Sequence, residues 1–447
     1  MERFIMKQLL DWKHSPYRKP LILKGVRQVG KTWVLKEFGR QHYENTAYFN
    51  FDENEEYKQF FETTKDVDRI LQNLMLASGQ KIVPEKTLII FDEVQDCLKV
   101  INSMKYFCEN APEYHIACAG SLLGIALSRP SSFPVGKVNF MQIDPMTFTE
   151  FLLANGDENL AVYMDTVDTP EPIPDAFFNP LCEKLKMYYV TGGMPEPVLM
   201  WTQARDVSAM QEALSGILGA YERDFAKHPD VSEFPKISMI WKSIPSQLAR
   251  ENKKFIYKVV KGDARAREYE DALQWLVDAR LVHKIYRSSA PALPVSAYDD
   301  LSAFKIYLVD VGLLRRLAML APTAFGEGNR LFTEFKGALT ENYVLQTLIT
   351  QFEVVPRYWS QSNPPYEVDF LIQRDNDIFP IEVKSETNTT GRSLRKFKEL
   401  FGDKVKLRIR FSLSNLKLDG DVLNIPLFMA DHADRLIGLV LNYTHGK

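Results

Sequence analysis

The segment 21–39 constrains the fold of this chain more than any other stretch. Within it, Gly25 and Gly30 are separated by four residues, and Lys31 and Thr32 follow directly. This is the P-loop pattern, G-x-x-x-x-G-K-[ST]. An apolar run before the glycines predicts a buried strand, and the residues after the motif predict a helix. A simple glycine turn before a helix is the alternative, but the strand–loop–helix context favours a phosphate-binding α/β domain.

The expected chemistry of this loop follows from its backbone. Glycines let the loop curl so that N–H groups point at phosphate oxygens, and the positive end of the next helix faces the same oxygens. Lys31 is expected to reach the β- and γ-phosphates of ATP, and the Thr32 hydroxyl to hold Mg²⁺. The residues expected to bind the nucleotide here are Gly25, Val26, Arg27, Gln28, Val29, Gly30, Lys31, Thr32 and Trp33.

An acidic pair follows the next strongly apolar segment. Leu88 to Phe91 are four consecutive apolar residues and predict a strand that is buried on both faces. Asp92 and Glu93 come directly after it, where a P-loop fold places its Walker B acids. Asp92 is expected to bind the nucleotide's Mg²⁺, and Glu93 to orient or deprotonate the attacking water. A solvated acidic loop is the alternative, and the upstream P-loop argues against it.

Ser121 ends the next strand-like segment, Tyr114 to Ser121. Two roles stay open for it: a polar sensor of the γ-phosphate, or the N-cap of a helix that would start at Leu122. Strands and helices alternate from Leu21 to Ile143, which predicts a mostly parallel sheet covered by helices.

Length and composition limit the class of protein. A chain of 447 residues exceeds one typical core, so about two to four domains are expected. No apolar run approaches the roughly 18 residues that cross a bilayer, and the N-terminus lacks a signal-peptide pattern. A cytoplasmic protein without a membrane segment is expected. The four cysteines form no metal-ligand or disulfide-like array, so reduced thiols are expected.

Four stretches together resemble a family of prokaryotic AAA-type ATPases with an uncharacterised C-terminal region. They are GVRQVGKT, LIIFDEVQ, CAGSLLG and IDPMTFTEFL. The resemblance implies Mg²⁺-dependent ATP hydrolysis by in-line attack of water, and it leaves a homo-oligomer open because such ATPases often form rings. Family members usually carry an arginine where this chain has Lys137, which keeps the charge but not the planar fork of a finger. Arg129 is a nearby substitute, and Arg223 is a candidate second sensor. All three have surface charges as the alternative role.

The middle of the chain reads as a connection followed by a small module. Residues 165–180 are rich in Pro, Asp and Thr and predict an exposed connection. Three helical segments and two strands then follow between 237 and 308, which is the order of a winged helix. Basic residues before the third helix suggest a phosphate-contacting surface, and a protein-binding or structural module is the alternative. They are Lys253, Lys254, Lys258, Lys261, Arg265 and Arg267.

A second set of chemical residues lies near the C-terminus. Glu341 falls in a predicted helix, Asp369 in a strand, and Glu382 and Lys384 two apart in the next strand, where they share one face. This pattern resembles the PD-(D/E)xK nuclease core. The resemblance implies a catalytic set of all four residues, with Mg²⁺ held by Asp369 and Glu382 and with Lys384 positioning water. A nuclease fold kept for binding or assembly is the alternative.

These observations predict an α/β chain in four parts. They are an AAA-type P-loop ATPase domain (1–155), a helical lid and connection (156–230), a winged-helix-like module (231–320) and a nuclease-like domain (321–447). The expected activity is ATP hydrolysis with Mg²⁺, coupled to nucleic-acid binding or cleavage. The alternative is a nucleotide-gated binding or scaffold protein, with DNA or a protein as partner, whose nuclease-like domain is inactive.

Overall fold

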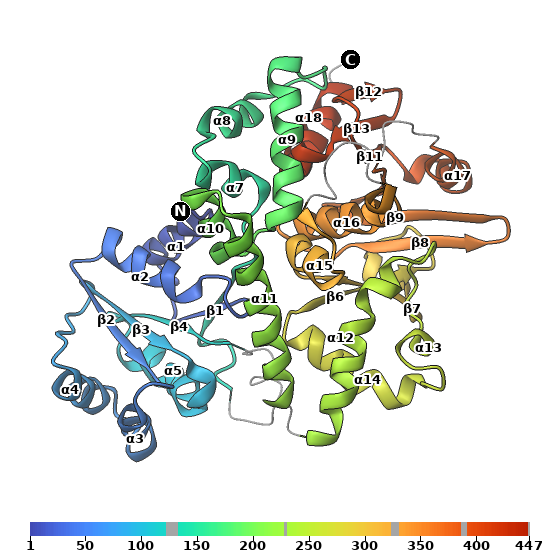
Figure 1. Ribbon diagram of the computed structural model, residues 1–447. Coiled ribbons are helices and arrows are strands. Elements are labelled where there is room, and N and C mark those ends of the chain that lie inside the picture. Colours follow the sequence, from blue (N-terminus) through green and yellow to red (C-terminus); the bar gives the residue numbers. More distant parts are fainter. Residues whose placement is uncertain (122–132, 228–229, 323–329, 386–390, 446–447) are drawn as a thin grey trace. The chain divides into compact units, whose positions relative to one another are not determined.

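The computed structural model divides into two compact units (Figure 1). It describes all residues except 122–132, 228–229, 323–329, 386–390 and 446–447. The N-terminal unit comprises Glu2–Asp144 with 278–281, and the C-terminal unit comprises 145–277 and 282–447. Of the four expected parts, the last two lie entirely within the C-terminal unit apart from 278–281, and the first is divided at Asp144.

The N-terminal unit is built on a five-stranded sheet in the order β2-β3-β4-β1-β5. Every neighbouring pair is parallel, which confirms the predicted α/β class. Parallel strands need crossover connections, and helices supply them. The elements are α1 (Ile5–His14), β1 (Leu21–Lys24), α2 (Lys31–His42), β2 (Asn45–Asn50), α3 (Glu55–Thr63), α4 (Val67–Ser78), β3 (Thr87–Asp92), α5 (Leu98–Asn110), β4 (His115–Ala119) and β5 (Asn139–Gln142).

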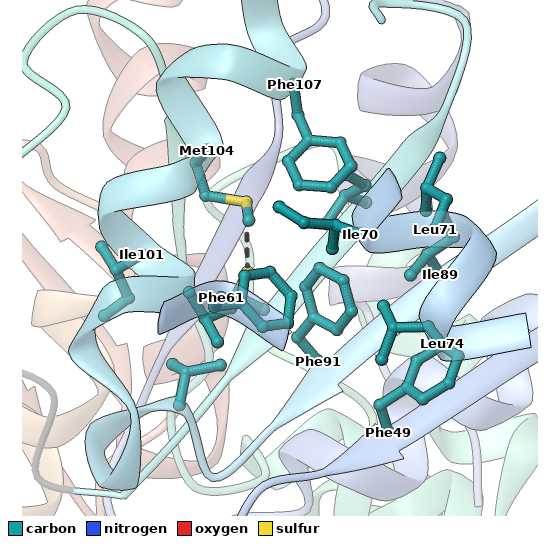
Figure 2. Close-up of a cluster of buried hydrophobic side chains, with 14 of the residues drawn as sticks. Phe49, Phe61, Ile70, Leu71, Leu74, Ile89, Phe91, Ile101, Met104 and Phe107 are labelled. Carbon is teal, nitrogen blue, oxygen red and sulfur yellow. Dashed lines mark hydrogen bonds between the residues drawn. The ribbon is translucent and has the colours of Figure 1, made fainter. Parts of the chain in front are cut away.

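Strand β3 lies at the centre of this unit's packing. All six of its residues are buried, as the unbroken apolar run predicts for a strand covered on both faces. On one face, Ile89 and Phe91 pack into a cluster with side chains from α3, α4 and α5, and Phe91 meets Phe61 edge-on with ring centroids 5.5 Å apart (Figure 2). Helix α2 contacts β2, β3 and β4. This packing fixes the carboxyl end of β3, where Asp92 lies.

The C-terminal unit begins with helices and then builds an eight-stranded mixed sheet, in the order β12-β13-β11-β10-β9-β8-β6-β7. Its helices are α7 (Phe148–Ala154), α8 (Glu158–Thr166), α9 (Asp175–Thr191), α10 (Pro195–Ala204), α11 (Val207–Asp224), α12 (Phe234–Leu248), α13 (Tyr257–Val260), α14 (Ala266–Asp278), α15 (Val311–Leu317), α16 (Arg330–Ile349), α17 (Arg392–Phe401) and α18 (Ala433–His445). Its strands are β6 (Val282–Ser288), β7 (Asp299–Leu308), β8 (Arg357–Ser362), β9 (Pro365–Arg374), β10 (Asp377–Val383), β11 (Arg408–Ser412), β12 (Lys417–Asp419) and β13 (Val422–Pro426).

The ribbon of β6 and β7 joins the sheet of the nuclease-like segment. The two strands pair antiparallel with each other, and β6 continues to β8 through the pair Arg287–Tyr358. The strands predicted to form the wing of a winged helix are thus part of a larger sheet. Helix α16, which carries Glu341, packs against β7 and β10, and α17 packs against β9 and β10.

Two local features complete the comparison with the sequence. Helix α9 begins at Asp175, inside the stretch 165–180 that was expected to be an exposed connection, and it contains Pro180. Helix α7 starts with a capping box in which Thr147 and Glu150 satisfy each other's backbone N–H groups. Within the described ranges, every helix is too short or too polar to span a lipid bilayer.

Candidate functional site

The P-loop has the backbone that its sequence predicts. Gly30 has a φ of 96° and Gln28 a φ of 64°, so two residues of the loop adopt the left-handed conformation that curls the chain. Helix α2 begins directly afterwards, with Gly30 as its N-cap. Gly25 is required for a different reason. A Cβ there would lie 2.5 Å from the carbonyl oxygen of Ile143. Gly25 therefore lies directly against the backbone that follows β5.

Lys31 is held inside the loop. Its Nζ donates hydrogen bonds of 2.9 Å each to the carbonyl oxygens of Gly25 and Val26. Burial lowers the pKa of Lys31 to about 8, although the nearby carboxylates of Glu93 and Asp92 act in the opposite direction. A buried cation with this environment gains strongly from an anionic ligand.

Asp92 is the most heavily hydrogen-bonded carboxylate of the P-loop site. Its Oδ2 accepts from the Thr32 hydroxyl at 2.7 Å and from the Tyr48 hydroxyl at 2.9 Å. Its Oδ1 accepts from the backbone N–H of Glu93 at 3.0 Å. Thr32 and Asp92, the two residues predicted to hold Mg²⁺, therefore lie in contact. Tyr48 was missed from the sequence, where it is one aromatic residue in an alternating strand, and no motif marks it.

Glu93 adopts a left-handed backbone conformation with a φ of 51° directly after β3. This is unusual for a residue other than glycine and is common at functional sites. Its Oε2 accepts from the side-chain amide of Gln95 at 2.6 Å and from the backbone N–H of Ser121 at 3.4 Å. The structure thus brings Ser121 to Glu93 through its backbone. The sensor role of its hydroxyl stays a prediction, and the alternative helix from Leu122 onward lies outside the described residues.

Strand order explains why these groups meet. Strand β4, which leads to Ser121, lies between β1, which leads to the P-loop, and β3, which leads to the acidic pair. All three strands are parallel, so their carboxyl ends share one edge of the sheet. In open α/β sheets, this edge is where ligands bind.

The candidate arginine-finger and second-sensor residues are Lys137, Arg129 and Arg223. The Nζ of Lys137 forms an ion pair of 2.8 Å with Oε1 of Glu109, and this bond raises the pKa of Lys137. Arg129 lies outside the described residues. Arg223 is an exposed residue of α11 in the C-terminal unit. Their roles toward the nucleotide stay predictions.

In the C-terminal unit, Glu341 and Asp369 belong to one buried group of charges. Glu341 accepts from Lys253 and, at 3.1 Å, from the hydroxyl of Tyr307. Burial alone would raise the pKa of Glu341, but Lys253 and Lys305 hold it below its usual value. Lys253 was expected on an exposed phosphate-contacting surface. It points inward instead, because the carboxylate of Glu341 compensates its charge.

The pKa of Asp369 is shifted in the opposite direction to that of Glu341. Burial, together with the nearby charge of Glu341, raises the pKa of Asp369 to about 7. The Oδ2 of Asp369 accepts a hydrogen bond of 2.7 Å from the backbone N–H of Val383. The fully buried Lys305 pairs with Glu367 on the same strand as Asp369. Cationic amines therefore lie among these carboxylates.

Glu382 and Lys384 form a separate ion-paired group. The Oε1 of Glu382 lies 3.2 Å from Nζ of Lys384, and its Oε2 lies 3.3 Å from Nε of Arg410. The predicted sharing of a face by Glu382 and Lys384 agrees with this contact. Among the residues that the structure describes, no group of three or more His, Cys, Asp or Glu side chains is placed to hold a metal ion. The backbone N–H of Val383, the residue after Glu382, donates to Asp369 and so links the two groups.

Three family models match successive segments of the chain. Residues 17–152 match the AAA domain. This match covers the P-loop and the acidic pair. Residues 182–324 match a domain of unknown function (DUF8612), and residues 336–428 match a second domain of unknown function (DUF4143). No curated protein matches the chain.

Solved structures with likeness to the chain are distant. A Walker-type ATPase of Pyrococcus abyssi is 13% identical, with 71% of this chain and 95% of that chain covered and a TM-score of 0.43. The Orc1 protein of Aeropyrum pernix, solved in complex with DNA, is 12% identical over 71% and 90%, with a TM-score of 0.25. The RuvB Holliday junction branch migration motor of Thermotoga maritima is 12% identical over 65% and 90%, with a TM-score of 0.29. At TM-scores below 0.5, none of them assigns a function to this chain.

Proposed function

We propose that the AAA domain binds ATP with Mg²⁺ and hydrolyses it to ADP and phosphate. One observation carries the proposal: Thr32 and Asp92, from the two motifs that P-loop ATPases use to bind Mg²⁺, are in hydrogen-bond contact beside the buried amine of Lys31. The two motifs are about 60 residues apart in sequence, so their contact depends on the fold.

The donor set fits the proposed cofactor. Mg²⁺ prefers oxygen ligands, usually one or two from the protein with the rest from phosphates and water, and a hydroxyl next to a carboxylate matches that preference. Thr32 and Asp92 are the residues that would hold it, and the ion would supply charge neutralisation between the phosphate oxygens. Lys31 binds the phosphates as a cation, and the curled backbone of the loop orients them.

Glu93 serves as the residue that directs water. It is held on one side by the Gln95 amide and on the other by the Ser121 backbone, so its carboxylate has a defined position at the edge of the sheet. A carboxylate fixed in this way can orient a water molecule and accept its proton as the γ-phosphate is attacked.

Two substitutions test this assignment. Lys31→Ala should abolish ATP binding measured by calorimetry, with Lys7→Ala, an exposed lysine of the same unit, as the control. Glu93→Gln should keep ATP binding and lower the hydrolysis rate by about a hundredfold or more, since general-base catalysis contributes on that scale. Glu56→Gln is the matched control on an exposed glutamate. Hydrolysis at the parental rate by Glu93→Gln would refute the assignment.

For the nuclease-like segment, we propose a binding role without strand cleavage, gated by the nucleotide state of the AAA domain. The supporting observation is that Glu382 is paired with Lys384 and Arg410, and Glu341 with Lys253 and Tyr307. A metal ion would have to displace these protein cations. Metal-dependent cleavage of nucleic acid is the second candidate, and the Glu-x-Lys spacing favours it.

Strand cleavage discriminates between the two. The protein and Lys384→Ala are incubated with single- and double-stranded DNA and RNA, with Mg²⁺ or Mn²⁺, and with or without ATP. We expect intact strands in every condition while ATP hydrolysis continues. Cleavage that is lost in Lys384→Ala and on addition of EDTA would establish a metal nuclease and overturn the binding role.

A further inference from the structure

A cavity in the C-terminal unit lies over the face of strand β11. Its volume is about 430 Å³, within the range of roughly 300–1,000 Å³ that is usual for ligand sites. Four cationic side chains line it together with a single carboxylate. The lining residues are Gly391, Arg395, Arg408, Arg410, Ser414, Asn415, Lys417, Asp419, Val422 and Asn424.

Two of the arginines are held in place by carboxylate groups. Arg408 and Arg410 are two apart on β11, so they share a face of the sheet. Arg408 binds Asp421 through Nε at 3.1 Å and through a second guanidinium nitrogen. Arg410 binds Glu382 at 3.3 Å. Carboxylates that hold one edge of a guanidinium fix its orientation, and Arg is suited to bidentate binding of phosphate.

The positive excess comes from the rim. Arg395 is an exposed residue of α17, and Lys417 is an exposed residue of β12. Both side chains line the cavity. Lys417 lies 3.7 Å from Asp419, and both side chains are largely exposed, so this ion pair is weak. The amide nitrogen of Asn424 donates to the backbone oxygens of Ser414 and Asn415, which fixes the loop between β11 and β12.

We propose that this cavity binds the phosphodiester backbone of a nucleic-acid strand. Its lining residues, all of them in the described part of the chain, include no aromatic side chain on which a base could stack. Arginine and lysine side chains bind phosphate oxygens, and contacts to phosphate position a strand without reading its sequence. The formal charge of the whole chain is −3, so this cationic cavity is a local feature and not part of a generally basic surface.

The proposal extends the binding role of the nuclease-like segment and is independent of ATP hydrolysis. The cavity adjoins the Glu382–Lys384 pair through Arg410. A strand bound there would pass beside those residues whether or not they cut it.

Binding is measured by fluorescence anisotropy with labelled oligo-dT and oligo-dA, at several salt concentrations, without nucleotide and with EDTA. We expect equal affinity for both sequences and a linear fall of log affinity with log salt. The double variant Arg395→Glu/Lys417→Glu should weaken binding about tenfold or more and reduce the magnitude of the salt slope by about 2. Arg69→Glu, at an exposed helical arginine of the AAA unit, is the matched control and should change neither value.

Other outcomes overturn the proposal. Unchanged affinity in the double variant would exclude the cavity. Loss of oligonucleotide binding in Arg267→Glu alone would move the site to the basic residues at the start of α14. Binding of pyrophosphate, measured by calorimetry, together with no binding of either oligonucleotide would show a small phosphate ligand in place of a strand. The ATPase rate and melting temperature of each variant are measured in parallel. If a variant is folded and hydrolyses ATP normally but does not bind the oligonucleotides, its defect lies in strand binding and not in the ATPase.

Discussion

At the scale of single residues, neighbours decide what a carboxylate can do. Asp92 and Asp369 are the same residue type on apolar strands: Asp92 ends β3, and Asp369 lies in the middle of β9. Asp92 accepts three hydrogen bonds, two of them from hydroxyl groups. Asp369 accepts one backbone hydrogen bond and lies near the charge of Glu341, which together with burial raises its pKa. The first arrangement suits a metal ligand, and the second favours a protonated carboxyl group.

The hydroxyl of Tyr48 should matter for catalysis because it helps to hold Asp92. Tyr48→Phe removes that donor and keeps the ring, over which Nζ of Lys36 lies at 3.5 Å. A hydrogen bond to a charged group is worth about 1.5–3 kcal/mol, and Asp92 retains two other donors. We expect kcat/KM for ATP to fall roughly five- to thirtyfold, measured in a steady-state ATPase assay. Tyr17→Phe, on an exposed tyrosine, is the control, and a change below about twofold in both would contradict the role.

The raised pKa of Asp369 makes stability depend on pH. Its carboxyl holds a proton in the folded chain up to about pH 7 and loses it near pH 3.8 when unfolded. The protonated carboxyl therefore contributes its full stabilisation to the fold below about pH 4. This stabilisation is lost as the pH rises toward 7, by at most about 1.4 kcal/mol per pH unit. Asp369→Asn should remove this part of the slope between pH 5 and 7. Denaturant unfolding of both proteins across that range measures the difference, and parallel curves would show that Asp369 is ionised in the fold.

At the scale of elements, periodicity and motif predicted most helices and strands of both units. The P-loop strand and helix, the buried strand before Asp92 and the Glu-x-Lys strand all form as expected. The start of α9 was missed because residues 165–180 are rich in Pro, Asp and Thr and show little periodicity. Proline lacks the N–H for an i−4 hydrogen bond, yet the helix runs from Asp175 through Thr191. Packing of its buried face, which includes Leu181 and Leu185, offsets that loss.

The connection between β1 and α2 depends on one glycine. In Gly25→Ala the new Cβ would be 2.5 Å from the backbone oxygen of Ile143, which is not free to move as a side chain would be. We expect a loss of ATP affinity of tenfold or more, roughly 1.4 kcal/mol, with a lower melting temperature. Gly216→Ala is the control, because nothing lies within 4 Å of a Cβ there and helix propensity should stabilise α11 by about 0.5–1 kcal/mol. Equal nucleotide affinity in both variants would contradict the steric argument.

At the scale of the whole molecule, the decisive feature is a continuous sheet in the C-terminal unit. The segments expected as a winged-helix-like module and as a nuclease-like domain share this sheet through β6 and β8. Two partly buried ion pairs also join them, Lys253 with Glu341 and Lys305 with Glu367. Their cores are therefore combined, whatever their evolutionary relation.

Removing one partner of such an ion pair should destabilise the fold more than removing both partners. Lys305→Met leaves Glu367 without its cation and should destabilise the C-terminal unit by about 3–5 kcal/mol. The double variant Lys305→Met/Glu367→Met removes both charges and should recover most of that loss. Equilibrium denaturation, followed by tryptophan fluorescence, measures both. If the double variant is no more stable than the single one, the pair does not act as a unit.

The local parts of this protein can be predicted from its amino-acid pattern: a P-loop between a strand and a helix, an acidic pair after a buried strand, and strands that carry Asp369 and Glu382. These follow from backbone sterics and from side-chain periodicity, which act over a few residues. The contact of Tyr48 with Asp92 and the pairing of Lys253 with Glu341, 88 residues away, arise only when the chain folds. The tertiary structure also brings Arg395 and Lys417 to the cavity that contains Arg408 and Arg410. Such contacts depend on strand order and on the burial of charge, and neither is encoded in the spacing of nearby residues.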